Sequence, residues 1–304
     1  MSKLAQVTKG KLVKPLLVLV YGPDGVGKST FGAEAPDPIF LGPEAGTDNL
    51  DVSRYPEPKT WGDTQSGLKD LATGDHAYKT LVLDSLDWIE PLLFNAIIKD
   101  DAKGAKTIET ACGGYGKGYV EAVQRWQDDF ISQLNIIRNV RKMNIVLIAH
   151  SEVVSFNDPQ NQLNYQRYEL KLHKKASALF REYVDAVLFG NYEVFIKKDG
   201  LHTKTFGDGA RIFHTERRPG FDAKNRYGLP FTLPLNWQSF ADAAASGNPE
   251  SAAAVKQRIE ALMSCVTDPT VIEKMPGLMI AAGDNVAKLS QIANRLAVLS
   301  GEGN

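Results

Sequence analysis

Short apolar runs alternate with longer amphipathic stretches over the first two thirds of the chain. The runs are rich in Val, Ile and Leu and are bounded by turn residues, which is typical of strands buried on both faces of a sheet. They lie at Leu16–Tyr21, Pro38–Leu41, Thr80–Leu83, Ile145–Ala149 and Ala186–Phe189. The pattern predicts an α/β fold in which helices cover both faces of a mostly parallel sheet.

Two further patterns refine this fold. From Val120 onward, apolar residues recur at three-and-four spacing, which predicts a helix that leads into the strand Ile145–Ala149. After residue 190 the pattern changes to alternation, with strand-like runs at Tyr192–Ile196 and Ala210–Thr215 and a turn at Lys198–Gly200. We therefore expect a hairpin that extends the sheet with antiparallel strands.

The last quarter of the chain has a different composition. Residues 243–250 are small and polar, as in a linker, so we expect a core over 1–242 and a small helical C-terminal domain over 251–304. The apolar spacing in that domain predicts two amphipathic helices interrupted around Pro276–Gly277, with room for a third short helix. A contact with a partner protein and a simple packing role both remain open for it.

Composition and charge narrow the class of protein. The 304 residues are 43% hydrophobic and 23% charged, which is ordinary for a soluble globular protein. The net charge of -1 conceals a basic middle, because residues 99–226 contain 21 basic and 16 acidic side chains. Cys112 and Cys265 match no zinc or redox spacing, so we expect unpaired cytosolic thiols. The first apolar run is too short to cross a membrane, and we expect a cytoplasmic protein.

The strongest motif follows the first predicted strand. The stretch fits GxxxxGK[ST], a phosphate loop whose glycines let backbone N–H groups turn toward a polyphosphate. Lys28 would supply a point charge to the β- and γ-phosphates of ATP, and the Ser29 hydroxyl would bind Mg²⁺. The expected nucleotide-binding residues are Gly22, Pro23, Asp24, Gly25, Val26, Gly27, Lys28, Ser29 and Thr30.

Polar residues at the ends of other strands complete a catalytic set with Lys28. Asp84 ends the third run and is expected to hold Mg²⁺ together with Ser29. Glu44 follows the second run between Pro and Gly, and is expected to orient or deprotonate the attacking water. His150 ends the fourth run, where it could sense the γ-phosphate, although a structural role stays open. Asp87 fits either the metal's water shell or a helix N-terminus.

The order of these elements resembles the RecA-like ATPase core. More narrowly, residues 12–240 resemble phage-encoded RecA-like ATPases of the AAA-domain type, which act in single-strand annealing and recombination. The resemblance depends on Gly22–Thr30, Glu44–Thr47, Leu83–Ser85, Gly113–Gly118, Ile148–His150 and Lys224–Pro230. It implies an ATP- and Mg²⁺-dependent ATPase that binds single-stranded DNA in the host cytoplasm and promotes annealing or strand exchange.

The resemblance also implies how such a protein assembles and binds DNA. It implies a homo-oligomer, either filament or ring, and we expect the C-terminal helices to be able to contact a single-strand binding protein. Two loops, Lys99–Gly118 and Ser151–Lys175, would hold DNA through cations and aromatic rings. The DNA-binding candidates are Lys103, Lys106, Tyr115, Lys117, Phe156, Tyr165, Arg167, Tyr168, Lys171, Lys174 and Lys175.

Further cations would act between subunits. Lys224 and Arg226 are expected to reach the γ-phosphate bound by an adjacent subunit, with Arg211, Arg217 and Arg218 as weaker candidates for that role. Two other functions stay open. One is a helicase-like motor built on the same core, and the other is a nucleotide-binding switch or adaptor without affinity for DNA.

Overall fold

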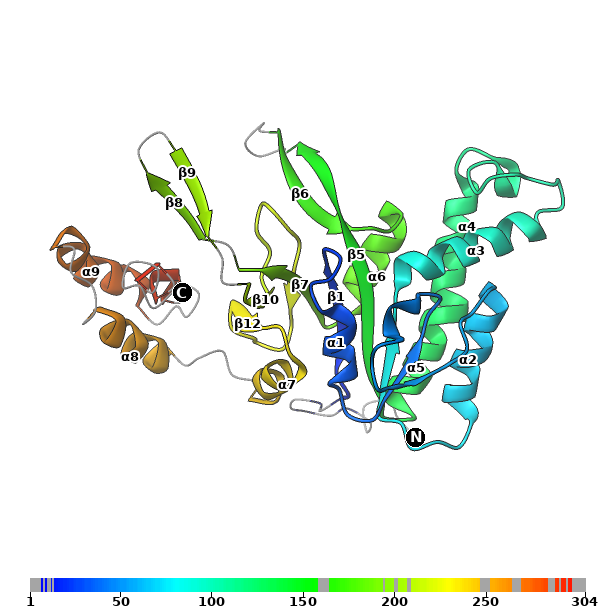
Figure 1. Ribbon diagram of the computed structural model, residues 1–304, viewed down its shortest axis with the longest axis horizontal. Helices are drawn as coiled ribbons and strands as arrows, with labels where there is room; N and C mark the ends of the chain where they lie inside the picture. The colour runs from blue at the N-terminus through cyan, green and yellow to red at the C-terminus, as the bar shows by residue number, and fades with distance from the viewer. Residues whose placement is uncertain are drawn as a thin grey trace.

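A single sheet organises the first part of the molecule (Figure 1). The computed structural model describes residues 7, 9, 12, 14–157, 164–193, 195–199, 202–206, 209–246, 252–263, 269–283, 288–289, 291–293 and 295–296. Within them the sheet has ten strands, in the order β12-β10-β7-β1-β5-β4-β2-β3, with β6 paired to β5 and β11 paired to β7.

All five apolar runs form strands, and these strands are parallel, as predicted. Because the runs are short and apolar throughout, each strand can be buried on both faces. A two-residue strand, β3, joins the edge beside β2 in the same direction. The parallel strands are β1 (Leu17–Gly22), β2 (Pro38–Leu41), β3 (Ser53–Arg54), β4 (Thr80–Leu83), β5 (Asn144–Asn157) and β7 (Ala186–Tyr192).

Helices cover both faces of the sheet, as predicted. Alternate residues of β1 divide between two apolar clusters: Val18 packs with Phe31 and Phe240, whereas Leu17 packs with residues of the opposite layer. On the first face lie α1 (Lys28–Ala33) and α7 (Trp237–Ser246). On the second face lie α2 (Trp61–Thr73), α3 (Leu86–Asp100), α4 (Lys117–Arg125), α5 (Ser132–Asn139) and α6 (Lys174–Tyr183).

The helix predicted from Val120 is present but is not uniform. Helices α4 and α5 are joined by a π-helical turn over Trp126–Ile131. Trp126 is fully buried there, and its ring packs at right angles against Trp61, with centroids 5.2 Å apart. The added residue in the turn keeps large aromatic side chains on the core side of a helix that runs across the sheet.

The long strand β5 corrects one prediction. It does not end at Ala149 but continues to Asn157 and pairs antiparallel with β6 (Asn164–Leu170). The predicted DNA-binding loop Ser151–Lys175 is therefore mostly a β-ribbon, with residues 158–163 outside the described part. Cross-strand pairs such as Phe156–Tyr165 stabilise it, and their rings lie 5.4 Å apart.

The antiparallel extension is present with a different pairing. Strand β10 (Arg211–His214) pairs with β7, with Arg211 opposite Tyr192, and β12 (Thr232–Pro234) pairs with β10. The chain between Tyr192 and Arg211 forms a separate hairpin of β8 (Phe195–Asp199) and β9 (His202–Phe206). The expected single hairpin was thus wrong in its pairing: Lys198 and Asp199 of the predicted turn belong to β8, and Gly200 lies outside the described residues.

The C-terminal part corrects the predicted linker. Ala243–Ser246 belong to α7, whose Phe240 is fully buried against Phe31, and only 247–250 of the predicted linker lie outside the described residues. Helices α8 (Ala252–Met263) and α9 (Pro269–Ala282) follow, with further helical residues between 288 and 296. Pro276 lies inside α9 and does not interrupt it.

These C-terminal helices share a core of their own. It includes Val255, Ile259, Met275 and Leu289, and it has no member from the two clusters of the sheet. Across the described ranges, none of the helices is both long and apolar enough to span a bilayer.

Candidate nucleotide-binding site

The phosphate loop lies at the carboxyl end of β1, between β7 and β5. Gly25 and Gly27 have positive φ angles of 72° and 103°, which a residue with a Cβ atom rarely adopts. At Gly22 the backbone passes close to β7, so that an added Cβ atom would lie 2.2 Å from the Gly190 carbonyl oxygen. The glycines of the motif are therefore required by this backbone path.

Lys28 is the first residue of α1 and is only 6% exposed. Its ammonium donates hydrogen bonds to the carbonyl oxygens of Gly22 and Pro23, at 3.2 and 3.0 Å. Burial lowers the pKa of Lys28, and the surrounding carboxylates, Asp24 first, oppose this effect. The side chain is thus folded into the loop, where it can supply charge to a bound polyphosphate.

Ser29 and Asp84 meet beside this lysine. The Ser29 hydroxyl donates a 2.6 Å hydrogen bond to Oδ2 of Asp84. The two residues follow β1 and β4, which are separated in the sheet by β5. Asp84 is 4% exposed, and burial raises the pKa of its carboxyl to about 6. A buried carboxylate next to a hydroxyl is an oxygen donor set that suits Mg²⁺, and a cation would offset the cost of burying the charge.

Glu44 is brought to the same place by the end of β2. The backbone of Gly42 runs against Asp84, where an added Cβ atom would lie 1.7 Å from the Asp84 carbonyl oxygen. This close approach allows Oε2 of Glu44 to accept a 3.0 Å hydrogen bond from the Ser85 hydroxyl. Ser85 therefore orients the carboxylate that was expected to act on water.

His150 ends the buried part of β5 and is held by α3. Asp87 accepts from the His150 backbone N–H at 3.0 Å, and its other oxygen lies 2.9 Å from Nδ1. This contact raises the pKa of His150. On the opposite side of the ring, Nε2 lies 3.5 Å from Asp24 and 3.7 Å from Glu44. The imidazole thus links α3 to both the phosphate loop and Glu44.

Four predicted catalytic side chains therefore gather at one edge of the sheet: Lys28, Glu44, Asp84 and His150. Two further residues, Ser85 and Asp87, orient these side chains, and the sequence did not predict that role for either. For Ser85, the hydroxyl directly after the acidic strand end was the feature that could have indicated it. Asp87 was considered as a metal-shell or helix-terminus residue; it does lie in the first turn of α3, and it is in addition the partner of His150.

Comparison with known proteins places this site in a family. A family model described as the AAA domain matches residues 14–227. The chain belongs to the AAA domain family. The matched range contains the phosphate loop, Glu44, Asp84 and His150, and it ends before β12, α7 and the C-terminal helices.

Two solved structures are similar to this AAA-domain chain. The crystal structure of the RadB recombinase is 14% identical with a TM-score of 0.36, covering 68% of this chain and 84% of that chain. The flagellar accessory protein FlaH from Methanocaldococcus jannaschii is 11% identical with a TM-score of 0.31, covering 73% and 95%. A search of curated proteins found no match.

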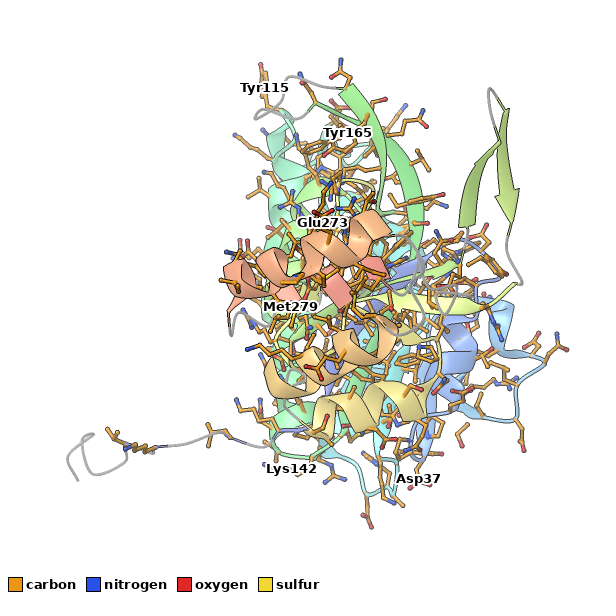
Figure 2. The ribbon with its side chains drawn as sticks, turned by 90° about the vertical axis from the view of Figure 1, so that its left-hand side faces the viewer. Asp37, Tyr115, Lys142, Tyr165, Glu273 and Met279 are labelled. Atoms are coloured by element: carbon orange, nitrogen blue, oxygen red, sulfur yellow. The ribbon has the colours of Figure 1, made fainter. Side chains whose placement is uncertain are left out.

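The DNA-binding candidates of the AAA domain lie in two segments above this edge. Figures 1 and 2 show the segment between α3 and α4, with Tyr115, at the same end of the molecule as the β5–β6 ribbon, with Tyr165. In the first segment Lys103, Lys106 and Lys117 are exposed, and Tyr115 is 100% exposed. Asp101 fixes this segment by accepting the backbone N–H groups of Lys103, Ala105 and Cys112.

In the predicted loop Ser151–Lys175, which contains the ribbon and the first residues of α6, the candidates divide into exposed and packed residues. Lys171, Lys174 and Lys175 are exposed, and Phe156 and Tyr165 are half-buried against each other. Arg167 is only 3% exposed, with its guanidinium 4.8 Å from the centre of the Phe156 ring, so it is turned away from solvent and its DNA contact stays a prediction. Tyr168 packs on Phe189, with ring centroids 5.1 Å apart, and is also turned toward the core.

The expected intersubunit cations lie at the opposite edge of the sheet. Lys224 pairs with Val187 near the start of β7, whereas the phosphate loop adjoins the end of that strand. The Lys224 ammonium donates to the carbonyl oxygens of Arg181, Glu182 and Val184, which places it at the C-terminus of α6. Arg226 remains 58% exposed, 3.7 Å from Asp185.

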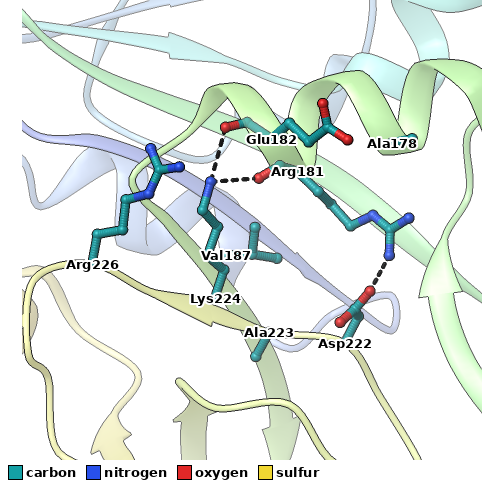
Figure 3. A pocket seen from close by; sticks show the side chains of 8 residues that line it. All are labelled: Ala178, Arg181, Glu182, Val187, Asp222, Ala223, Lys224 and Arg226. Atoms are coloured by element: carbon teal, nitrogen blue, oxygen red, sulfur yellow. Dashed lines mark hydrogen bonds and ion pairs between the residues drawn. The ribbon is translucent and has the colours of Figure 1, made fainter.

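These side chains line a cavity of about 510 Å³. Figure 3 shows its lining residues, among which Arg181 is paired with Asp222. Neither Lys224 nor Arg226 can reach the phosphate loop of its own chain. A role for them at a nucleotide would require a neighbouring subunit and stays a prediction.

Proposed function

We propose that this AAA-domain protein hydrolyses ATP with Mg²⁺ and that the bound nucleotide controls its affinity for single-stranded DNA. The observation that supports this most is the path of β5. The strand passes from His150, which contacts Asp87, directly into the ribbon. Where the ribbon returns, the backbone N–H of Lys171 donates to the His150 carbonyl oxygen at 2.9 Å. His150 thus contacts the nucleotide site through Asp87 and the ribbon through Lys171.

For hydrolysis, each side chain of the site has a separate task in this proposal. The phosphate loop and Lys28 bind and orient the polyphosphate, and Ser29 with Asp84 would hold Mg²⁺, which offsets charge on the phosphates. Glu44, oriented by Ser85, accepts a proton from the attacking water or aligns it. His150, close to Asp24 and Glu44, senses whether the γ-phosphate is present.

For DNA binding, the exposed side chains above the site have suitable chemistry. Lysines neutralise phosphates and aromatic rings stack on bases, without selecting a sequence. Both are present in the segment 101–117, whereas the ribbon offers the rings of Phe156 and Tyr165, and the exposed side chains of Lys171, Lys174 and Lys175 follow it directly along the chain. We propose that the protein works as a homo-oligomer, in which Lys224 and Arg226 act across subunits, and that it anneals or exchanges strands in phage recombination.

The decisive experiment combines binding and turnover in three proteins: wild type, Lys28→Ala and Glu44→Gln. A fluorescently labelled single-stranded oligonucleotide is titrated at several salt concentrations, with and without ATP and Mg²⁺. We expect wild type to bind tightly only with ATP, and Lys28→Ala to lose nucleotide binding and this response.

Glu44→Gln is expected to keep ATP binding, to lose turnover by about 10²- to 10⁴-fold, and to hold DNA longer than wild type. If wild type shows no oligonucleotide binding at low salt with ATP, the proposed DNA function is wrong. If Glu44→Gln keeps wild-type turnover, Glu44 does not have its proposed role. Unwinding of a forked duplex would instead indicate a translocating motor.

A further inference from the structure

Two neighbouring side chains outside the phosphate loop contact it from β7 and β10. Tyr192 and Arg211 are opposite each other in the register of these strands. The Tyr192 hydroxyl donates to the Gly25 carbonyl oxygen at 3.1 Å. A Cβ atom added to Gly27 would lie 2.7 Å from Nη1 of Arg211, so the guanidinium lies directly on the loop. One cross-strand pair therefore touches the loop at two of its glycines.

The charge of Arg211 is available at this position. Other arginines face carboxylates, such as Arg125 at Asp100, Arg138 at Asp185 and Arg181 at Asp222. Arg211 has no acidic partner within the described ranges, and its side chain is exposed. The rest of its contact at Gly27 is apolar, since Leu235 lies 3.6 Å from the same added atom. A guanidinium without a carboxylate partner in the described part of the chain thus lies against a loop whose sequence suits phosphate binding.

We propose that Arg211 binds the phosphate chain of the nucleotide held by its own subunit. This inference rests on the proposed nucleotide function. A guanidinium presents several N–H donors in a planar fork that matches phosphate oxygens. Its place beside Gly27, next to Lys28, sets it over the part of the loop where backbone N–H groups cradle phosphates. Arg211 was a weaker candidate for an intersubunit role, but it contacts Gly27 of its own chain.

The position of Arg211 also connects the nucleotide to the β8–β9 hairpin. The hairpin is inserted between Tyr192 and Arg211, so both of its connections to the sheet begin at residues that touch the loop. When phosphates draw the guanidinium inward, the start of β10 is fixed together with the end of β7. Nucleotide binding is therefore expected to slow amide exchange at the base of the hairpin.

The test compares wild type, Arg211→Ala and Arg211→Lys, with Lys79→Ala as the control. Lys79 is an exposed cation paired with Asp37 at the amino end of β4, away from the loop. Binding of a fluorescent ATP analogue is measured at protein concentrations where light scattering shows a monomer. Thermal unfolding without nucleotide is measured in the same samples.

We expect Arg211→Ala to bind the analogue about ten- to a hundredfold more weakly, because a charge-assisted hydrogen bond to phosphate is lost. Arg211→Lys should recover part of this loss, and the affinity of Arg211→Ala should depend less on salt than that of wild type. Unfolding temperatures of the nucleotide-free proteins should agree, since Arg211 is exposed.

Equal affinity of wild type and Arg211→Ala as monomers would overturn the role of Arg211 while leaving the nucleotide function intact. A wild type that binds no ATP analogue would instead remove the proposed function itself. A loss of affinity that Lys does not relieve at all, and that comes with a lowered unfolding temperature, would show a purely structural role.

Discussion

At the scale of single residues, the nucleotide site is held in an energetically unfavourable state. Asp84 is a carboxyl buried beside another acid, Glu44, and burial is the main cause of its raised pKa. An acid whose pKa is higher in the folded protein than in the unfolded chain lowers stability once it ionises. The folded protein without nucleotide therefore bears a cost that a bound cation would relieve.

Replacement of Asp84 by Asn should expose this cost. Stability of the wild type should fall as pH rises from about 4 to about 6, and should stay low above that range. Asp84→Asn should remove the fall and be about 2–3 kcal/mol more stable at pH 8, but nearly equal at pH 4. Urea unfolding at both pH values measures the difference, with Asp37→Asn, an exposed acid, as the control.

Added Mg²⁺ and ATP complete this test. They should raise the stability of the wild type by about 2.7 kcal/mol at a hundred times the dissociation constant, and raise that of Asp84→Asn far less. A variant that is destabilised at pH 8, or stabilised by Mg²⁺ and ATP as strongly as wild type, would contradict the assignment.

The sequence predicts the residues of this site better than their contacts. Lys28 and Asp84 could be found because their roles follow from local signals, a glycine-rich motif and an acid at a strand end. Asp87 could not be assigned to His150, since 63 residues separate them and only the packing of α3 beside β5 brings them together. The contact of Arg211 with Gly27 likewise depends on the pairing of β10 with β7.

At the scale of elements, the β5–β6 ribbon is the main departure from expectation. Each buried strand could be predicted, because an apolar run identifies it without knowledge of its neighbours. From Val153 to Asn157 the outer part of β5 alternates exposed and half-buried residues, and its strand character depends on pairing with β6 across seven residue pairs. Such a ribbon gives exposed side chains a more defined spacing than a loop would.

A shortened ribbon should separate DNA binding from nucleotide binding. Replacement of Ser155–Gln166 by Asn-Gly would close a tight turn directly on the Val154–Arg167 pair. We expect at least about tenfold weaker binding to a single-stranded oligonucleotide, because the stacking rings of Phe156 and Tyr165 are lost. Binding of ATP should change by less than about twofold, since the phosphate loop is untouched.

Lys142→Asn provides the matched control for the ribbon. Lys142 lies at the opposite end of the molecule (Figure 2) and has a φ angle of 61°, which Asn tolerates. Removal of this charge should leave oligonucleotide binding unchanged. Undiminished DNA binding by the shortened ribbon would show that the ribbon is not the binding element.

At the scale of the whole molecule, the boundary between the two parts lies after α7. Trp237 and Phe240 pack on Phe31 of α1, at centroid distances of 5.5 and 5.7 Å, so α7 belongs to the sheet domain. Helices α8 and α9 have a separate core. The Ala-rich stretch 243–246 looks like a linker in sequence, but alanine also favours helix. Its helical state depends on the packing of the preceding rings of Trp237 and Phe240, which the sequence does not reveal.

Two truncations test this boundary. A chain that ends after Ser246 should fold cooperatively and bind ATP as the full chain does. A chain that ends after Asn236 should lose at least about 3 kcal/mol, because two buried aromatic rings are removed from the core around Phe31. Circular dichroism melting and nucleotide titration measure both. Equal stability of the two truncated chains would show that α7 is not part of the sheet domain.

The register of β5 has a mechanical consequence. The strand that leads into the ribbon lies between two parallel neighbours, paired with β1 from Ile145 to His150 and with β4 from Asn144 to Leu147. A pull on the ribbon along the strand would load these hydrogen bonds in shear, so that many must break together. The ribbon is therefore attached to a strand that hydrogen bonds hold on both sides, and a force exerted on the ribbon would reach the phosphate loop without first separating β5 from its neighbours.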